Sequence, residues 1–518
     1  MIQLVESVAD RVSRSRLFWL CLTLSVWVSN LWWRFHSPLN GDVAWYLYAT
    51  ERLQQGAKLY RDVSDLNLPL VFFIHLPAVM IASFLKLPAP AVFHCMVWLF
   101  AAIAVAFLCA TVRRTVPGDI AIPFFLLVCV SVSVLQANRG DFEQRDSLAG
   151  IAFLILIGSV YGRAERFGRT TTLRYLLVAL ASIVIAVKPY MILPGIFAVS
   201  WLIRRAGWRR TVTFPEVWIP LGVVAISGVL TLIFFPEYFL LSAETMKYYS
   251  AYNESVAGIL RTVLPMLAVG FMGVVWRSES AIAPLVRLSG LTTLGFAASV
   301  VLQHKGWSYH CAPLAIWAGV TVSVIIADLV MRRSVYDALF LFPASLLIIC
   351  VPALLAANTV RTNRAGWQNE DAVSSYLMEH GPGKTVLPLT TDLWVDFPLI
   401  EDAQCRLVIP DPTLWRLPGL YRDQVVSATA GASARYHAPS EMNDDEKTVF
   451  KQIVNAVSAK HPAYILVQRK KPMQGMGALH FDMLDYFSQD PLFRSELAHY
   501  RVAARNGSVD LLVRQGPQ

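Results

Sequence analysis

The stretch "AVFHCMVWLFAAIAVAFLCATVRR", Ala91 to Arg114, indicates the class of this protein. Before its two final arginines it contains no Asp, Glu, Lys or Arg. About 20 such residues suffice for a helix to cross the hydrocarbon core of a bilayer. Basic residues directly after a span mark its cytoplasmic end. The stretch is therefore typical of a membrane-spanning helix whose carboxyl end, at Arg113–Arg114, faces the cytoplasm.

Similar apolar runs fill the chain from Leu17 to about Leu355. Of all 518 residues, 55% are hydrophobic and only 16% are charged, whereas soluble domains carry about 25% charged residues. The formal charge of +9 comes from short arginine clusters between the runs, so it argues for membrane topology and against a nucleic-acid partner. The candidate spans are 17–35, 69–86, 91–112, 119–137, 147–160, 174–187, 189–203, 217–235, 258–275, 286–302, 311–330 and 335–357.

Charge placement decides which runs cross. Arginines before Leu17 put the N-terminus in the cytoplasm, and Arg113–Arg114 must return there. Two full crossings between these points would place the arginine pair outside. We therefore predict about eleven transmembrane helices, with 69–86 as an interfacial or re-entrant segment on the outer side. The alternative is two ordinary spans that violate the positive-inside rule.

The chain divides into two predicted domains: a transmembrane domain, 1–357, and an extracytoplasmic α/β domain, 358–518, which the last span delivers to the outside. In the second domain, "TVLPLTTDLW", "RLVIP" and "AYILVQR" have the pattern of buried strands. Residues 444–459 have helical periodicity, and "DMLDYFSQ" begins another helix. Cys405 is alone in this domain, and the chain has no C-x-x-C spacing for a metal.

The predicted outer loops hold most of the polar residues with unusual surroundings. In the first loop, Asp42 opens a helix that we expect to lie at the membrane interface, and Tyr46 on this helix is a candidate substrate-binding residue. Asp42 is also the expected N-cap of that helix, which is a structural alternative to a catalytic role. The second loop, "NRGDFEQRDS", places Arg145 and Asp146 beside a span, either as a solvated loop or as a pocket of paired charges.

A third outer loop, "QHKGWSYH", carries three cationic or potentially cationic side chains, His304, Lys305 and His310. Lys188 lies at the tip of a short hairpin on the same side. A lysine at an outer boundary usually extends to lipid headgroups, but several donors around a glycine would suit a phosphate group. Carboxylates in two loops and cations in others fit a displacement in which a carboxylate accepts a proton and the cations stabilise a departing phosphate.

These segments resemble the GT-C superfamily of membrane glycosyltransferases, which includes protein O-mannosyltransferases, the lipid A aminoarabinose transferase and oligosaccharyltransferase catalytic subunits. The likeness rests on "GDVAWYLYATERLQQGAKLYRDVSDLNLPL", "DFEQRDSLAG" and "QHKGWSYHCAPL". It implies a GT-C-like fold, a polyprenyl-phosphate sugar donor and an inverting transfer of a hexose or pentose. Asp42 then matches the catalytic acid, Arg145 a phosphate-binding arginine, and His304 and Lys305 the late cationic motif.

One segment departs from the family pattern. Relatives have Glu-His where this chain has Asp146 and Ser147, so a catalytic role of Asp146 and metal binding by this loop are less well supported. A divalent metal, Mg²⁺ or Mn²⁺, stays open, because some members of the superfamily use one and others do not. The resemblance also implies a bacterial inner membrane, a glycan, lipid or protein acceptor, and contact with membrane lipids.

Two other functions fit parts of the sequence. A transporter or flippase for lipid-linked glycans would need ionisable residues deep in the spans, and few are present apart from Arg261. A surface polysaccharide polymerase or ligase of another fold would use the same kinds of outer-loop residues.

Overall fold

The computed structural model describes residues 16–119, 121–136, 140–165, 171–332, 371–429, 432–469, 473–507 and 509–515. By internal contacts it divides into two units. We call the first the helical unit, Met1–Pro38, Pro77–Leu232 and Glu254–Thr359. We call the second the α/β unit, Leu39–Leu76, Ile233–Asn253 and Val360–Gln518. The predicted boundary at 357 and the predicted span 335–357 lie outside the described residues.

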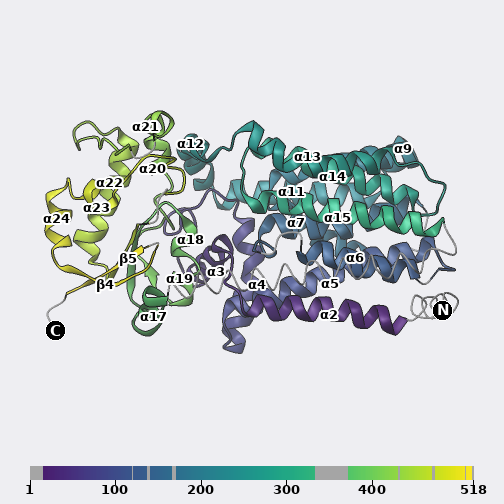
Figure 1. The fold of residues 1–518 in the computed structure, drawn as a ribbon, viewed down its shortest axis with the longest axis horizontal. Coiled ribbons are helices and arrows are strands. Elements are labelled where there is room, and N and C mark those ends of the chain that lie inside the picture. Colours follow the sequence, from purple (N-terminus) through teal and green to yellow (C-terminus); the bar gives the residue numbers. More distant parts are fainter. Residues whose placement is uncertain are drawn as a thin grey trace, which may run out of the picture. The chain divides into compact units, whose positions relative to one another are not determined.

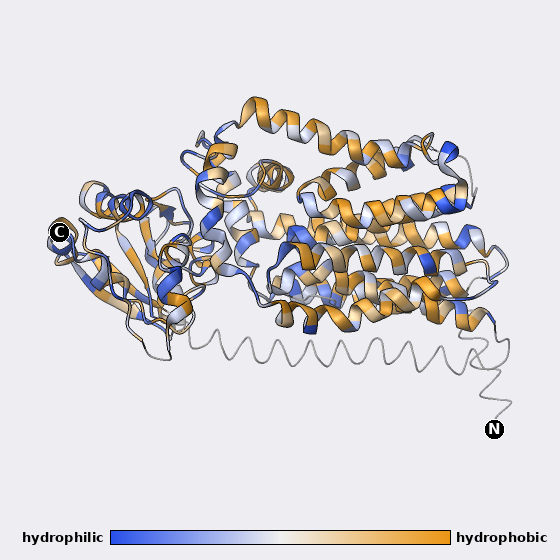
Figure 2. Ribbon diagram, turned by 90° about the horizontal axis from the view of Figure 1, so that it is seen from above, coloured by the Kyte–Doolittle hydropathy of each residue, from blue (hydrophilic) through white to orange (hydrophobic). Residues whose placement is uncertain are grey.

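Every predicted run within the described residues is a helix. The helices of the helical unit, with α4 shared between the units, are α2 (Arg16–Phe35), α4 (Leu70–Leu85), α5 (Ala89–Thr115), α6 (Ala121–Gln136), α7 (Arg145–Ala164), α8 (Thr172–Ala186), η1 (Pro189–Met191), α9 (Ile192–Ala206), α10 (Trp208–Thr211), α11 (Pro215–Phe234), α13 (Val256–Val275), α14 (Ala283–Gln303) and α15 (Ser308–Met331). Six of these, α5, α7, α11, α13, α14 and α15, are long and apolar enough to cross a membrane. Figure 2 shows apolar residues over most of the long helices. The chain is thus a multi-pass membrane protein, and the count of eleven spans stays a prediction.

The segment 69–86 forms α4, a helix of 16 residues with Pro77 inside it. At 1.5 Å per residue such a helix is about 24 Å long, shorter than the ~30 Å hydrocarbon core. Pro77 is also where the chain passes from the α/β unit to the helical unit. The interfacial or re-entrant placement of this segment stays a prediction.

Helix α7 forms the centre of the helical unit. Every residue from Arg145 to Gly162 is buried, and α7 packs against α5, α8 and α15 (Figure 1). A Cβ on Gly150 would lie 2.9 Å from the Cα of Pro313, so a glycine here permits close approach of α15. The Trp317 indole then donates to the Gly150 carbonyl at 2.9 Å. This packing fixes the first turn of α7, where Arg145 and Asp146 lie.

The α/β unit is built on a five-stranded sheet of order β2-β1-β3-β5-β4. β1 (Thr385–Leu389) is parallel to β2 (Arg406–Leu407) and β3 (Tyr464–Gln468), whereas β5 (Val509–Arg514) is antiparallel to β3 and β4 (Tyr500–Arg505). The three predicted strands and the helix 444–459 are present. Strands β4 and β5 were not predicted.

Helices surround this sheet, and part of the unit comes from the first half of the chain. The apolar face of α22 supplies Val449, Ile453 and Val457 to a buried core with Ile465 and Val467 of β3. The helices of the unit are α3 (Gly41–Gln54), α12 (Glu237–Tyr249), η2 (Ser250–Tyr252), α17 (Asp371–His380), α18 (Leu393–Asp396), α19 (Leu399–Asp402), α20 (Leu417–Leu420), α21 (Arg422–Ser427), α22 (Asp444–Lys460), α23 (Met483–Phe487) and α24 (Pro491–Leu497).

Candidate functional site

The second predicted loop is a buried polar segment leading into α7. Asp141, Glu143, Gln144, Arg145 and Asp146 are all at most 6% exposed. Gln144 is the N-cap of α7, and its side-chain oxygen accepts from the Arg145 amide at 2.9 Å. So many buried polar groups require partners within the protein. The segment is therefore a pocket of paired charges, and the solvated-loop alternative is wrong.

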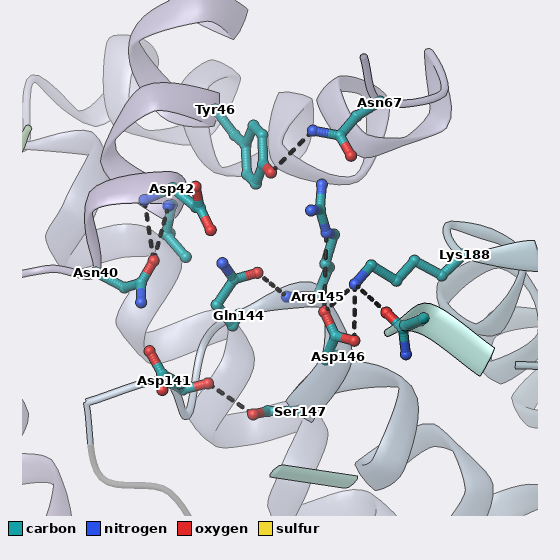
Figure 3. A network of polar contacts seen from close by, with 12 residues as sticks. Asn40, Asp42, Tyr46, Asn67, Asp141, Gln144, Arg145, Asp146, Ser147 and Lys188 are labelled. Carbon is teal, nitrogen blue, oxygen red and sulfur yellow. Dashed lines mark hydrogen bonds and ion pairs between the residues drawn. The ribbon is translucent and has the colours of Figure 1, made fainter. Parts of the chain in front are cut away.

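An ion pair joins this segment to the hairpin lysine. Lys188 Nζ lies 2.7 Å and 2.9 Å from the two carboxylate oxygens of Asp146, and 3.1 Å from Gln303 Oε1 (Figure 3). The Arg145 Nε lies 3.8 Å from Asp146. One carboxylate thus faces two cations. Asp146 is fully buried, and a buried carboxylate needs cations of this kind as partners. Because both oxygens of Asp146 already contact Lys188, the geometry favours a role in holding Lys188 over a role as a base.

The 304–310 segment adds further donors in the helical unit. Lys305 is 6% exposed and outside the candidate spans, and burial lowers its pKa to about 8. His310 is 3% exposed, and its Nδ1 has no hydrogen-bond partner among the described residues. The Lys188 ammonium lies 5.4 Å from the centre of the Tyr309 ring. Buried nitrogen donors on α7, α14–α15 and the α8–α9 connection therefore form a cation cluster, which we define as Arg145, Lys188, Lys305 and His310.

His304 has a different position from its neighbours. It is the C-cap of α14 in the left-handed conformation, with φ of 53°. Its carbonyl accepts from the Glu254 amide at 3.2 Å. These main-chain roles shape the turn that presents Lys305. No described residue shares a hydrogen bond with its side chain, so the phosphate-binding role of His304 stays a prediction.

A second layer of polar contacts supports the buried segment. His94 Nδ1 lies 2.5 Å from Glu143 Oε1. Arg34 stacks over the Phe142 ring at 4.8 Å. Ser308 donates to Asp141 at 2.6 Å. His94 was not among the predicted site residues, although an ionisable residue inside an apolar run is a signal of function or pairing.

In the α/β unit, Asp42 lies in the first turn of α3. The N-cap is Asn40, whose side-chain oxygen accepts from the amides of Asp42 at 3.0 Å and Val43 at 3.4 Å (Figure 3). The prediction that Asp42 caps the helix is therefore wrong, because Asn40 satisfies those donors first. The capping alternative to a catalytic role of Asp42 is removed.

Tyr46 is part of a buried network on the same helix. It is 2% exposed, and its hydroxyl accepts from the Asn67 side chain at 3.1 Å. Asp65 in turn accepts from Asn67 and, at 2.6 Å, from the Trp45 indole. All residues from Val43 to Thr50 are buried. The prediction of an amphipathic helix is wrong, since α3 is enclosed on nearly every side. Its placement at the membrane interface stays a prediction.

Residues from the carboxyl-terminal half of the chain pack against α3. A Cβ on Gly41 would lie 3.0 Å from the Phe397 carbonyl oxygen. The rings of Trp45 and Phe397 pack edge to face at 5.6 Å. The Tyr48 hydroxyl accepts from the Leu407 amide at 2.9 Å. Asp42 is thus carried by a helix that belongs to the α/β unit.

Apart from His304, the predicted site residues fall into two groups. Arg145, Asp146, Lys188, Lys305 and His310 come together in the helical unit, whereas Asp42 and Tyr46 lie in the α/β unit, and each group is described by itself. Among the described residues, no group of three or more His, Cys, Asp or Glu side chains could hold a metal ion.

Comparison with known proteins rests on solved structures. No protein-family model matches the chain, and neither does any curated protein. ArnT from Cupriavidus metallidurans bound to undecaprenyl phosphate is 12% identical, with a TM-score of 0.59, over 97% of this chain and 99% of that chain. Its apo state is 13% identical over the same shares, with a TM-score of 0.52.

A third structure is similar over less of its length. The arabinofuranosyltransferase AftD from Mycobacteria is 14% identical, and the match covers 97% of this chain and 40% of that chain, with a TM-score of 0.46. The two ArnT structures match nearly end to end and establish the fold. The predicted polytopic architecture is confirmed at that level: the chain is a polytopic membrane protein with the fold of ArnT.

Proposed function

We propose that the chain is a glycosyltransferase that moves a sugar from a polyprenyl-phosphate carrier to an acceptor at the outer face of the membrane. The buried cation cluster carries this proposal. Three permanently or partly charged nitrogens and a histidine are held in the helical unit, on a fold shared with an ArnT structure bound to undecaprenyl phosphate. Buried cations of this kind suit a phosphate better than a neutral solute. The shared fold also favours a transferase over a transporter.

In the proposed reaction, Asp42 accepts the proton of the acceptor hydroxyl as its oxygen attacks the anomeric carbon. The bond between that carbon and the phosphate oxygen breaks, and the electron pair leaves with the phosphate. Arg145, Lys188 and Lys305 stabilise the charge that develops on the departing phosphate. Attack opposite the leaving group inverts the anomeric centre. Asp146 orients Lys188, and His310 offers a further nitrogen to the phosphate.

From the positive-inside rule, we infer that Asp42 and the cation cluster lie on the outer side of the membrane. In a bacterial inner membrane the N-terminus then lies in the cytoplasm and the C-terminal domain in the periplasm. The need for Mg²⁺ or Mn²⁺ is tested by adding a chelator.

The test uses the full chain in isolated membranes. Radiolabelled undecaprenyl-phosphate hexose, pentose and aminopentose are added, and loss of label from the carrier is followed. We expect Asp42→Asn to lower transfer by roughly 10²–10⁴-fold, the usual contribution of a general base. The matched control is Asp62→Asn, an exposed first-loop acid whose side chain accepts from the Lys58 amide at 2.8 Å and has no ion pair with a described residue. Full transfer by Asp42→Asn would remove Asp42 as the base, and no transfer from any donor would contradict the proposed function.

A further inference from the structure

A second polar site lies at the other end of the helical unit. The loop between α13 and α14 and the end of α15 surround a cavity of about 710 Å³. Because α14 begins there with Ala283 and ends at Gln303, this cavity is a helix length away from the cation cluster. Its polar lining is formed by Arg277, Ser278, Glu279, Ser280, Arg287 and Arg332.

A buried carboxylate fixes the shape of this cavity. Asp328 is fully buried on α15 and accepts from the Trp276 indole at 2.8 Å, from Ser278 at 2.9 Å and from Ser280. It also pairs with Arg332 at 2.6 Å. Four donors on one carboxylate hold the loop in a single arrangement. The cavity is therefore built into the fold.

The lining is positively charged. Arg277 and Arg287 are exposed, and neither they nor Glu279 form an ion pair with a described residue. Arg287 Nε donates to the Trp276 carbonyl at 3.1 Å, which orients the guanidinium beside the cavity. Three arginines face two carboxylates, Glu279 and Asp328. The excess positive charge and the planar donor groups suit a phosphodiester.

An apolar surface adjoins the charged lining. The last turns of α13 expose Phe271 at 61% and Val275 at 52%, and α15 exposes Leu329 at 45%. These side chains lie within one or two turns of the cavity in sequence, on helices long enough to cross a membrane. A soluble phosphate would use the arginines alone, whereas a phospholipid would use the arginines and the apolar surface together.

We propose that this cavity binds the headgroup of an anionic membrane phospholipid, with its acyl chains along α13 and α15. The positive-inside rule predicts that the cavity faces the cytoplasm, where the anionic leaflet attracts basic residues. The site is independent of the proposed transferase chemistry. Its occupant would anchor the α13–α15 end of the helical unit.

The experiment measures binding of dioleoyl phosphatidylglycerol to the purified full chain in detergent by native mass spectrometry. We expect Arg277→Gln/Arg287→Gln to weaken the tightest binding at least tenfold. The first control, Arg209→Gln/Arg210→Gln, removes two exposed arginines of α10 and should leave the affinity unchanged. The second control, Arg277→Lys/Arg287→Lys, keeps the charge but not the planar guanidinium group, and we expect an intermediate affinity.

Three outcomes would overturn the proposal. One is equal lipid affinity in the wild type and the Arg277→Gln/Arg287→Gln variant. Another is an equal loss in the α10 variant, which would indicate nonspecific charge. The third is displacement of the lipid by inorganic phosphate or glycerophosphoglycerol at equal concentration, which would identify a free anion as the ligand. If the glutamine variant does not fold, the lysine variant replaces it with a smaller expected loss of affinity, and equal affinity of the lysine variant and the wild type then overturns the proposal.

Discussion

Lys188 and Asp146 form a buried ion pair in which one ammonium lies within 2.9 Å of both carboxylate oxygens. The carboxylate is fully buried, and the lysine side chain is 11% exposed. Removal of one partner leaves an uncompensated buried charge, which typically costs about 3–5 kcal/mol. Arg145 lies 3.8 Å from the same carboxylate and would still compensate part of its charge. We therefore expect Lys188→Met to lower the free energy of unfolding by about 3 kcal/mol, the lower end of that range. Thermal unfolding in detergent, followed by tryptophan fluorescence, measures this.

An exposed ion pair with the same shortest nitrogen–oxygen distance provides the control. Lys247 lies 2.7 Å from Asp445, but the two side chains are 61% and 43% exposed. Exposed pairs contribute about 0–1 kcal/mol, so Lys247→Met should change stability little. Similar losses in both variants would show that burial of the Asp146 pair has no energetic consequence.

The second prediction concerns Lys305, whose pKa burial lowers from its usual 10.5 to about 8. The ammonium is present below pH 8 and is lost as the pH rises through 8. If it binds phosphate, the affinity for undecaprenyl phosphate should fall roughly tenfold between pH 7 and pH 9, about 1.4 kcal/mol. Lys305→Arg keeps its charge in this range and should bind equally at both pH values. An unchanged affinity of the wild type would exclude Lys305 from phosphate binding.

The same shift predicts a pH effect on stability with the opposite sign. Between pH 8 and pH 10.5 the unfolded chain binds more protons at Lys305 than the folded chain does. Stability should therefore increase with pH in this window, through this group. Comparison of the wild type with Lys305→Met by thermal unfolding isolates the effect, which should be absent in the variant.

The third prediction concerns the approach of Gly41 to the Phe397 carbonyl. A Cβ at 3.0 Å forces a small displacement of α3, at a cost of about 1–3 kcal/mol for overpacking. The gain in helix propensity from Gly to Ala is only roughly 0.5–1 kcal/mol, so Gly41→Ala should be destabilising overall. Faster hydrogen exchange of the α3 amides and slower transfer are expected. Gly195→Ala in α9, where the Cβ meets open space, is the control and should be neutral or stabilising.

The fourth prediction concerns the pKa of Glu143. Burial raises the pKa of Glu143. The hydrogen bond and charge of His94, together with the charge of Arg34, lower this pKa by more than burial raises it, so the pKa lies below its usual 4.5. The resulting stabilisation is present above pH 4.5 and is lost as the pH falls through the folded-state pKa. We expect His94→Gln to be least stable relative to the wild type near pH 7, with a difference that narrows toward pH 4.

A double variant checks that assignment. In the Glu143→Gln background, His94→Gln should give a stability difference that no longer changes between pH 4 and pH 7. A persistent pH dependence would assign the effect to another group.

The sequence predicted elements where the physical signal is local. Long apolar runs gave α5, α14 and α15 within a few residues, because a span must be apolar over its whole length. Alternation and apolar runs gave β1 and β3. The paired charges of Arg145 and Asp146 also followed from their spacing at a membrane boundary.

Contacts between distant residues were not predictable in this way. The partner of Lys188 depends on the packing of α7 against the α8–α9 connection, and no periodicity encodes it. Asn40 rather than Asp42 is the cap because the helix begins at Gly41, two residues before the start at Val43 that a cap at Asp42 would give. The ends of helices are the least reliable part of such a prediction. The burial of α3 depends on Phe397 and Leu407, which only the folded chain brings near it.

The bond between Tyr48 and Leu407 joins residues 359 positions apart, and this has a consequence for biosynthesis. While the ribosome makes the spans, α3 has emerged but Phe397 and Leu407 do not yet exist. Trp45 and Tyr48 of α3 therefore lack these partners until residues 397–407 have been made. Late contacts of this kind expose nascent segments to misassembly. A ribosome stalled before residue 397 would therefore leave the helix that carries Asp42 without its contacts to Phe397 and Leu407.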